Sequence, residues 1–166
     1  MALIAFNKPY GVLSQFTDRG TEGARATLSD FIASLAGLRR RYRALRRPGW
    51  YSGAVQADGH PDIGWLNTDG AAMDDAAWRD GRRCIAIRMS AEADGQAGDE
   101  ICLLLMNAQA QPVDFRLPAG SWCALLNSAF PELPAHNIDS GGDGSMEVPA
   151  HAALLLAQQY YPCQQS

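Results

Sequence analysis

The sequence predicts a mainly β protein, an antiparallel β-sandwich of Greek-key type with one amphipathic helix near its N-terminus. Beyond residue 50, short apolar runs alternate with turn-forming residues at close spacing, which favours antiparallel strands over helices. Between residues 27 and 47, apolar residues recur at steps of three and four, the period of a helical stripe. The 166 residues are 47% hydrophobic and 19% charged, which is typical of a folded domain and not of a disordered chain.

Three segments follow from this pattern. Residues 1–26 contain two expected short strands, at 2–6 and 10–16, and a polar loop; residues 27–49 form the helix; residues 50–166 form the β-domain. The helix begins near Thr27 or Ser29, either of which can act as its N-cap, and ends at Pro48-Gly49. The stripe needs an apolar partner, so we expect it to pack on the sandwich or to form a homodimer through residues 27–47. Its members are Leu28, Phe31, Leu35, Leu38, Tyr42 and Leu45.

Within the β-domain, the expected strands are separated by turns rich in glycine, proline, asparagine and aspartate. Cys84–Met89 and Val113–Leu117 alternate apolar and polar residues, as strands with one buried face do. Ile101–Asn107 is apolar almost throughout and is expected at the centre of a sheet, whereas residues 127–146 are expected to be loop. The remaining expected elements are a strand at Ile63–Leu66, one helical turn at Asp74–Trp78, and strands at Trp122–Leu126, Met146–Val148 and Ala152–Ala157.

The charge pattern argues against several classes of function. A net charge of −4 and an isoelectric point near 5.2 do not favour a nucleic-acid binder, although six of the 14 basic residues fall between Arg39 and Arg47. These arginines are expected to form a solvated helix face or to pair with acids of a partner, in preference to binding RNA phosphates. No apolar run approaches the roughly 18 residues of a membrane span. The first residues lack signal-peptide features, so a cytoplasmic protein without membrane contact is expected.

No metal site and no cofactor are expected. Cys84 and Cys102 lie inside apolar runs and are expected to be buried thiols. The three histidines, His60, His136 and His151, do not combine with a cysteine at the spacing of zinc ligands.

Several separated motifs between residues 28 and 157 resemble, in the same order, glycogen debranching enzymes of the isoamylase type. The resemblance implies the C-terminal β-domain of those enzymes, a sandwich like the C-terminal domain of α-amylases. Enzymes of that family hydrolyse α-1,6-glucosidic branch linkages in a (β/α)8 barrel. No part of this sequence corresponds to that barrel. The motifs are Leu38–Tyr42, the block Asp62–Trp78 with Trp65, Asp69-Gly70 and Met73, and the stretches Leu103–Ala108, Pro112–Pro118 and Val148–Leu156.

Residues 3–32 resemble a different family. Leu3–Thr17, with Ala26–Leu28 and Phe31-Ile32, is similar to the start of bacterial ribosomal pseudouridine synthases. In that family a catalytic aspartate follows in an Arg-Leu-Asp block, which is missing here. The chain therefore looks like a fusion of two gene fragments, one without its nucleophile and the other without its barrel.

The predicted glucan-binding residues are Trp50, Tyr51, Trp65 and Trp122, since aromatic rings can stack on sugar rings. Trp78 belongs to the same aromatic group. The alternative is that Trp65, Trp78 and Trp122 fill the core or its rim, whereas Trp50 and Tyr51, just after the end of the helix, are expected to be exposed.

No catalytic residue is assigned, although four acids cluster after the first β-domain strand. A retaining glucan hydrolase needs two carboxyl groups facing one glycosidic bond. A turn and a helix N-cap explain the cluster better than such a pair. The four acids are Asp69, Asp74, Asp75 and Asp80.

Three functions remain open at this point. The preferred one is an accessory domain of a glycogen debranching enzyme, inactive alone. The others are a non-catalytic glucan-binding or interaction module and a remnant of a ribosomal RNA pseudouridine synthase. The expected partners are an α-glucan such as glycogen or limit dextrin, and a chain that carries the catalytic barrel.

Overall fold

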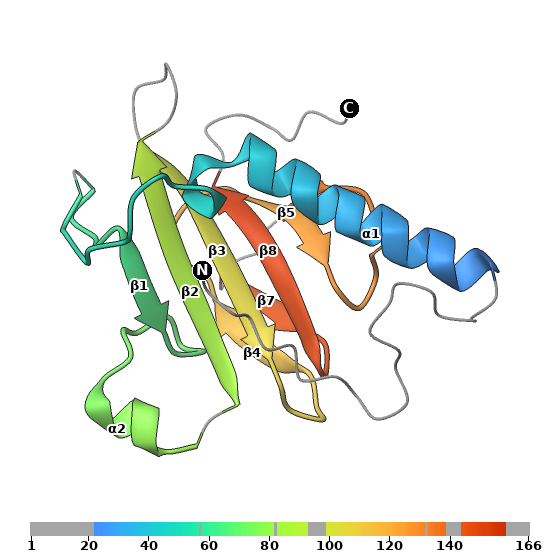
Figure 1. Cartoon of the computed structure of the whole chain (residues 1–166). Coiled ribbons are helices and arrows are strands. Elements are labelled where there is room, and N and C mark those ends of the chain that lie inside the picture. Colours follow the sequence, from blue (N-terminus) through green and yellow to red (C-terminus); the bar gives the residue numbers. More distant parts are fainter. Residues whose placement is uncertain are drawn as a thin grey trace, which may run out of the picture. The chain divides into compact units, whose positions relative to one another are not determined.

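The computed structural model describes residues 22–56, 58–81, 83–92, 99–131, 133–138 and 144–158. The predicted strands at 2–6 and 10–16, most of the segment that resembles pseudouridine synthases, and the tail beyond residue 158 lie outside the described residues. The chain divides between Gly37 and Leu38 into two units, and the second unit holds every described strand. Antiparallel strands dominate this unit, which confirms the predicted fold class (Figure 1).

The long helix, α1 (Glu22–Arg41), begins before the predicted start and ends before the predicted end. Tyr42 has extended backbone angles, with φ −99° and ψ 117°, and a short 3-10 helix, η1 (Arg43–Leu45), follows it. The prediction of a helix that continues to residue 47 was therefore wrong. The reason is tertiary, because Tyr42 and Ala44 are buried in one apolar cluster with residues of the sheet, Cys102, Leu155 and Ala157.

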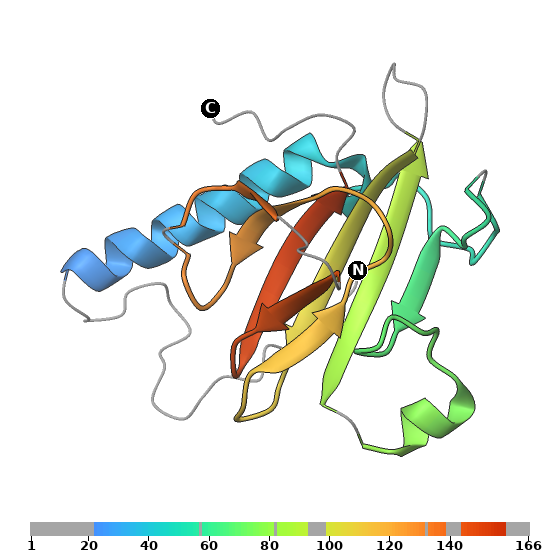
Figure 2. The same cartoon turned by 180° about the vertical axis from the view of Figure 1, so that it is seen from behind.

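Two antiparallel sheets make up the β-domain (Figures 1 and 2). The smaller sheet pairs β4 (Val113–Arg116) with β7 (Ser145–Val148). Strand β6 (His136–Ile138) falls in the region predicted to be loop, and the short helix α2 (Asp75–Arg79) is the predicted helical turn. The larger sheet has the order β1 (Ile63–Leu66), β2 (Cys84–Glu92), β3 (Asp99–Asn107), β8 (Ala152–Gln158), β5 (Trp122–Asn127) and β6 (His136–Ile138).

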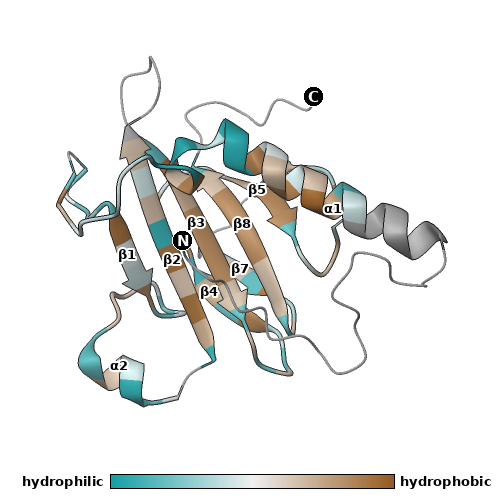
Figure 3. Cartoon of the chain, in the orientation of Figure 1, coloured by the Kyte–Doolittle hydropathy of each residue, from teal (hydrophilic) through white to brown (hydrophobic). Residues whose placement is uncertain are grey.

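The central strands of the larger sheet, β3 and β8, are largely buried on both faces. Leu103 and Leu105 of β3 contribute to the core between the two sheets, whereas Cys102 and Leu104 lie in the cluster that includes Tyr42. A strand with both faces buried has no polar face, which explains why the sequence of β3 is a continuous apolar run. The predicted central position of β3 is confirmed, and Figure 3 shows β3 and β8 as largely hydrophobic ribbons.

Strand β8 returns from the C-terminal end of the domain to lie between β3 and β5. Its register aligns Leu103 with Leu156 on one side and Ala124 with Leu156 on the other. Such a long return connection is typical of Greek-key topology. The sheet therefore depends on contacts between residues far apart in the sequence.

Asn107, the last residue of β3, joins the ends of both sheets and is 3% exposed. Its amide nitrogen donates to the carbonyl oxygens of Gln111, Val148 and Pro149, at 2.8, 3.1 and 3.0 Å. Its amide oxygen accepts from the backbone N–H of Gln109 at 2.9 Å. The side chain of Asn107 thus provides hydrogen-bond partners for backbone groups in the β3–β4 turn and at the end of β7.

None of the helices in the described ranges is both long and apolar enough to span a bilayer.

Candidate functional site

A buried carboxylate organises the loop between η1 and β1. Asp62 is 0% exposed, and its Oδ2 accepts hydrogen bonds from the guanidinium of Arg47 and, at 3.0 Å, from the backbone N–H of Ser52. Its Oδ1 accepts from the backbone N–H of Gly53 at 2.7 Å. The backbone oxygen of Asp62 also accepts from Ser90 of β2 at 2.8 Å. Asp62 therefore fastens the start of the loop to the larger sheet.

These contacts keep Asp62 ionised. The backbone N–H of Ser52 makes the largest contribution to lowering the pKa of Asp62 from 3.8 to about 2. Arg47 and Gly53 lower this pKa further, against the opposing effect of burial. A carboxyl group with such a pKa holds no proton near neutral pH, so Asp62 acts as a structural anion and is unsuited to be a catalytic acid.

A second ion pair holds the middle of the same loop. Arg88 of β2 is 6% exposed, and its guanidinium donates to the carboxylate of Asp58. It also donates to the carbonyl oxygen of Pro61 at 3.1 Å. Since Arg88 lies on the face of β2 that carries Cys84 and Ala86, the loop is clamped at the margin of the core between the sheets.

Glu100 of β3 fixes η1 to the sheet. Its Oε1 accepts a hydrogen bond from the backbone N–H of Ala44 at 2.8 Å. Burial raises the pKa of Glu100, and hydrogen bonds from the backbone of Ala44 and Arg43 offset part of that rise. The contact matters mainly as an acceptor for a buried N–H, because the charge itself is disfavoured by burial.

Replacing Glu100 by glutamine is expected to leave the thermal unfolding temperature within about 2 °C of the wild type, because glutamine keeps the acceptor oxygen and removes a partly buried charge. Glu100→Ala leaves the N–H of Ala44 without its acceptor and is expected to lower the free energy of unfolding by about 1–2 kcal/mol. Thermal unfolding and urea unfolding of the three proteins measure the two effects. A Glu100→Gln variant as unstable as Glu100→Ala would show that the charge, and not the acceptor, holds η1.

The structure separates the predicted glucan-binding residues. Trp122 is 2% exposed in the core between the sheets, and its indole N–H donates to a backbone carbonyl at 2.8 Å, so burial removes it from the predicted set. Trp50 is 96% exposed, as expected. Tyr51, expected to be exposed, is half-buried: its hydroxyl donates to the carbonyl oxygen of Ala44, and the guanidinium of Arg47 lies 5.2 Å from its ring centroid.

Trp65 forms an aromatic pair with Trp78. Trp65 lies on β1, the edge strand of the larger sheet, and Trp78 lies on α2. Their ring centroids are 5.8 Å apart and their planes meet at 66°, an edge-to-face arrangement. Trp65 is 40% exposed and Trp78 is 53% exposed. Trp65 is a predicted binding residue, and the structure places Trp78 beside it, which the sequence alone did not predict.

The nearby acids serve the backbone. Asp74 is the N-cap of α2 and accepts from the backbone N–H of Ala77 at 2.7 Å, which confirms the predicted cap. Asp69 accepts from the backbone N–H of Ala71 at 3.0 Å within the predicted turn. Asp75 is exposed and faces Arg79 at 4.0 Å. Asp69 and Asp74 thus make the turn and cap contacts that the sequence predicted.

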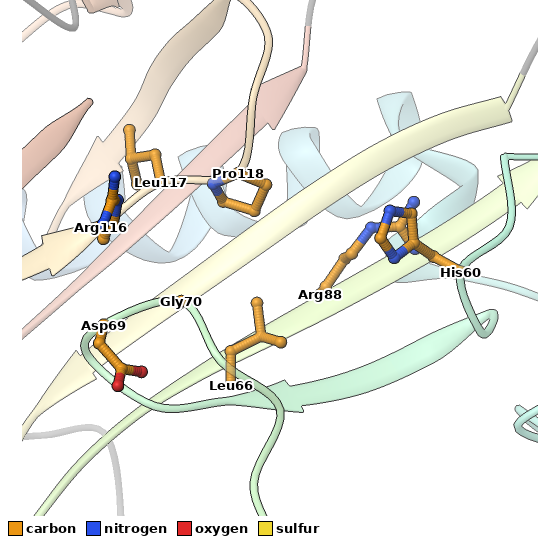
Figure 4. Close-up of a pocket in the computed structure, with 8 residues that line it drawn as sticks. All are labelled: His60, Leu66, Asp69, Gly70, Arg88, Arg116, Leu117 and Pro118. Atoms are coloured by element: carbon orange, nitrogen blue, oxygen red, sulfur yellow. The ribbon is translucent and has the colours of Figure 1, made fainter. Parts of the chain in front are cut away.

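A pocket of about 250 Å³ opens between β1, β2 and the connection from β4 to β5 (Figure 4). Figure 4 shows Arg88 and His60 towards one end and Arg116 and Asp69 towards the other. The charge of Arg88 is already balanced by Asp58, so this guanidinium is not free to bind an anion in the pocket. Its volume is also below the roughly 300–1,000 Å³ of typical ligand sites.

The arginine run is partly built into the fold. Besides Arg47, which pairs with Asp62, Arg46 donates through Nε to the carbonyl oxygen of Arg40 at 2.8 Å. The guanidinium of Arg41 lies 5.7 Å from the ring centroid of Tyr42.

Across the described ranges, no group of three or more histidine, cysteine, aspartate or glutamate residues is placed to hold a metal ion.

Three relatives show what the chain is similar to. Over 111 residues it is 34% identical to the glycogen debranching enzyme of Klebsiella pneumoniae subsp. pneumoniae, covering 67% of this chain and 15% of the relative. The enzyme of the same name from Dickeya chrysanthemi is 36% identical over 92 residues, covering 55% of this chain and 12% of the relative. That of Yersinia enterocolitica is 30% identical over 136 residues, covering 80% of this chain and 17% of the relative.

The chain therefore spans about one sixth or less of the length of these relatives. No family model matches the sequence. Among solved structures, pullulanase from Bacillus acidopullulyticus superposes with a TM-score of 0.49 and 16% identity, covering 82% of this chain and 14% of the pullulanase.

Proposed function

We propose that this chain, which is homologous to a domain-sized part of glycogen debranching enzymes, is an accessory domain that supports the hydrolysis of α-1,6-glucosidic branch linkages without performing it. The catalytic carboxylates are supplied by a barrel, either on a longer polypeptide or on a separate chain. The predicted placement of the matched segment at the C-terminal end of such an enzyme is part of the same proposal.

The observation that carries this proposal is that three carboxylates in or beside the loop between η1 and β1 make structural contacts. Asp58 pairs with Arg88, Asp62 is enclosed by Arg47 and backbone N–H groups, and Glu100 accepts from η1. A catalytic carboxyl group must be free to exchange a proton or attack the sugar. These three groups instead hold the fold together, which fits a supporting domain.

The test has two arms, both on folded protein. Purified chain incubated with glycogen limit dextrin is expected to release no α-1,6-linked chains, measured as new reducing ends. In the second arm, the matching segment of the Klebsiella enzyme is replaced by this chain, and the chimera is expected to debranch limit dextrin. The control is the same enzyme with the segment deleted, which is expected to lose soluble expression or activity.

Debranching by the isolated chain, in proportion to its concentration through successive purification steps, would overturn the non-catalytic assignment. A folded chimera without activity would show that this chain no longer supports the reaction of its relatives.

A further inference from the structure

The aromatic pair Trp65–Trp78 has no role in the network that holds the loop to the sheet. The neighbour of Trp65, Leu66, packs against the core between the sheets. Because successive side chains of a strand point to opposite faces, Trp65 points away from that core. The neighbour of Trp78, Ala77, is 9% exposed, so α2 is fixed by its inner face while Trp78 stays on its outer side.

Both rings are carried by a firmly held backbone. Trp65 pairs with Ile87 of β2 in the sheet register, and its carbonyl oxygen accepts from the N–H of Met73 at 2.8 Å. The N–H of Trp78 donates to the carbonyl oxygen of Asp74 at 3.0 Å, and the same residue caps the helix through its side chain. A site held this way needs little ordering on binding, which favours affinity for a small ligand.

The exposed area of the pair matches a small ring better than a protein surface. A tryptophan side chain presents about 150–250 Å², so exposed fractions of 40% and 53% leave roughly 200 Å² in all. A stable protein interface needs about 800 Å² on each partner. Apart from the small side chain of Ala76, the exposed residues around Trp78 on α2 and just after it are polar, so the apolar patch extends little along the helix: Asp75, Arg79 and Asp80.

We propose that Trp65 and Trp78 form a binding platform for the pyranose rings of an α-linked glucan; the choice of an α-glucan rests on the proposed function. A pyranose ring has apolar C–H faces and a polar rim of hydroxyl groups. Its C–H face lies on the open part of an indole, and its hydroxyl groups meet the charged side chains of α2. The edge-to-face angle of 66° lets the two rings contact successive sugars of a bent chain from different directions.

The experiment titrates the purified chain with maltoheptaose by isothermal titration calorimetry, with cellohexaose as the β-linked control. The wild type is expected to bind maltoheptaose and not cellohexaose. Trp78→Ala and Trp65→Ala are each expected to weaken the maltoheptaose Kd by about tenfold or more, since each removes one stacking surface. The matched control is Phe130→Ala, an aromatic residue that is 47% exposed and outside the pair, with an expected change below about twofold.

If Trp65→Ala disturbs the fold of β1, Trp78→Ala still tests the platform, because Trp78 is on the outer side of a capped helix. Circular dichroism and urea unfolding check that each variant is folded. A folded wild type that does not bind maltoheptaose overturns the proposal, as does unchanged binding in folded Trp78→Ala and Trp65→Ala.

Equal binding of cellohexaose would overturn the assignment of an α-linked ligand. The chimera assay separates this inference from the proposed function. A chimera that debranches, together with an isolated chain that binds no maltoheptaose, would leave the accessory function standing and remove the platform.

Discussion

Asp62→Ala is expected to lower the thermal unfolding temperature by about 10 °C, because it removes the anion that faces Arg47 and two backbone N–H groups in a site closed to water. In the loop between η1 and β1, an isolated bridge joins Val55 to Pro61, and the side chain of Asp62 holds the earlier part of the loop through the backbone N–H groups of Ser52 and Gly53. Differential scanning calorimetry measures the effect. Asp62→Asn, which keeps one acceptor oxygen, is expected to fall between the wild type and Asp62→Ala.

The matched control for this prediction is Asp75→Ala. Asp75 is also an aspartate facing an arginine, but its side chain is 93% exposed and the distance to Arg79 is 4.0 Å. Exposed pairs of this kind contribute little, so the unfolding temperature is expected to change by less than about 2 °C. Equal effects of the two substitutions would contradict the structural role of Asp62.

The pH dependence of Asp62 has a definite sign. Its pKa is lowered on folding from 3.8 to about 2, so its stabilising contribution is complete above pH 3.8 and is lost as the pH falls through 2. The difference in unfolding temperature between the wild type and Asp62→Asn is therefore expected to be constant near neutral pH and to shrink in that acid range. A difference that stays constant down to pH 2 would contradict the lowered pKa.

Asn107→Asp is expected to lower the free energy of unfolding by about 3 kcal/mol or more, although the two side chains have nearly the same shape. The asparagine amide donates to three carbonyl oxygens, and an aspartate would place a carboxylate oxygen against them in a buried site. Burial and the three acceptors both disfavour the charged form, so the variant is expected to be less unstable at acid pH, where the new carboxyl group is protonated.

Asn127→Asp is the control for this substitution. Asn127 ends β5, and its side-chain oxygen accepts from the backbone N–H of Ala129 at 2.9 Å. A carboxylate can accept the same hydrogen bond, so the free energy of unfolding is expected to change by less than about 0.5 kcal/mol. Urea unfolding of both variants at neutral and acid pH checks the pair of predictions, and similar losses in both would contradict the role of the Asn107 amide as a donor.

Different residues of the domain stabilise the fold and form the proposed binding surface. Asp62, Arg88 and Glu100 hold the loop and η1 against the sheet, whereas Trp65 and Trp78 are held at the edge of the sheet and stay open to solvent. The proposed glucan platform thus lies on rigid elements.

The sequence alone determined the class of fold and most strands, because alternation, apolar runs and turn residues are local signals. It also placed β3 at the centre and the cap of α2 at Asp74. The buried ion pairs were missed, although one signal was present: Arg88 follows Cys84 and Ala86 on the inward-facing positions of β2, where a charge requires a partner.

Only the tertiary structure decided which aromatic rings are available. Trp65 and Trp122 both occur in strands of similar composition, yet one lies on an edge strand beside a short helix and the other between two sheets. The end of α1 was decided in the same way, because burial of Tyr42 and Ala44 in a cluster with sheet residues outweighs the local preference to continue the helix. Exposure and burial depend on partners far away in the sequence, such as β8 for β3, and no local pattern records those partners.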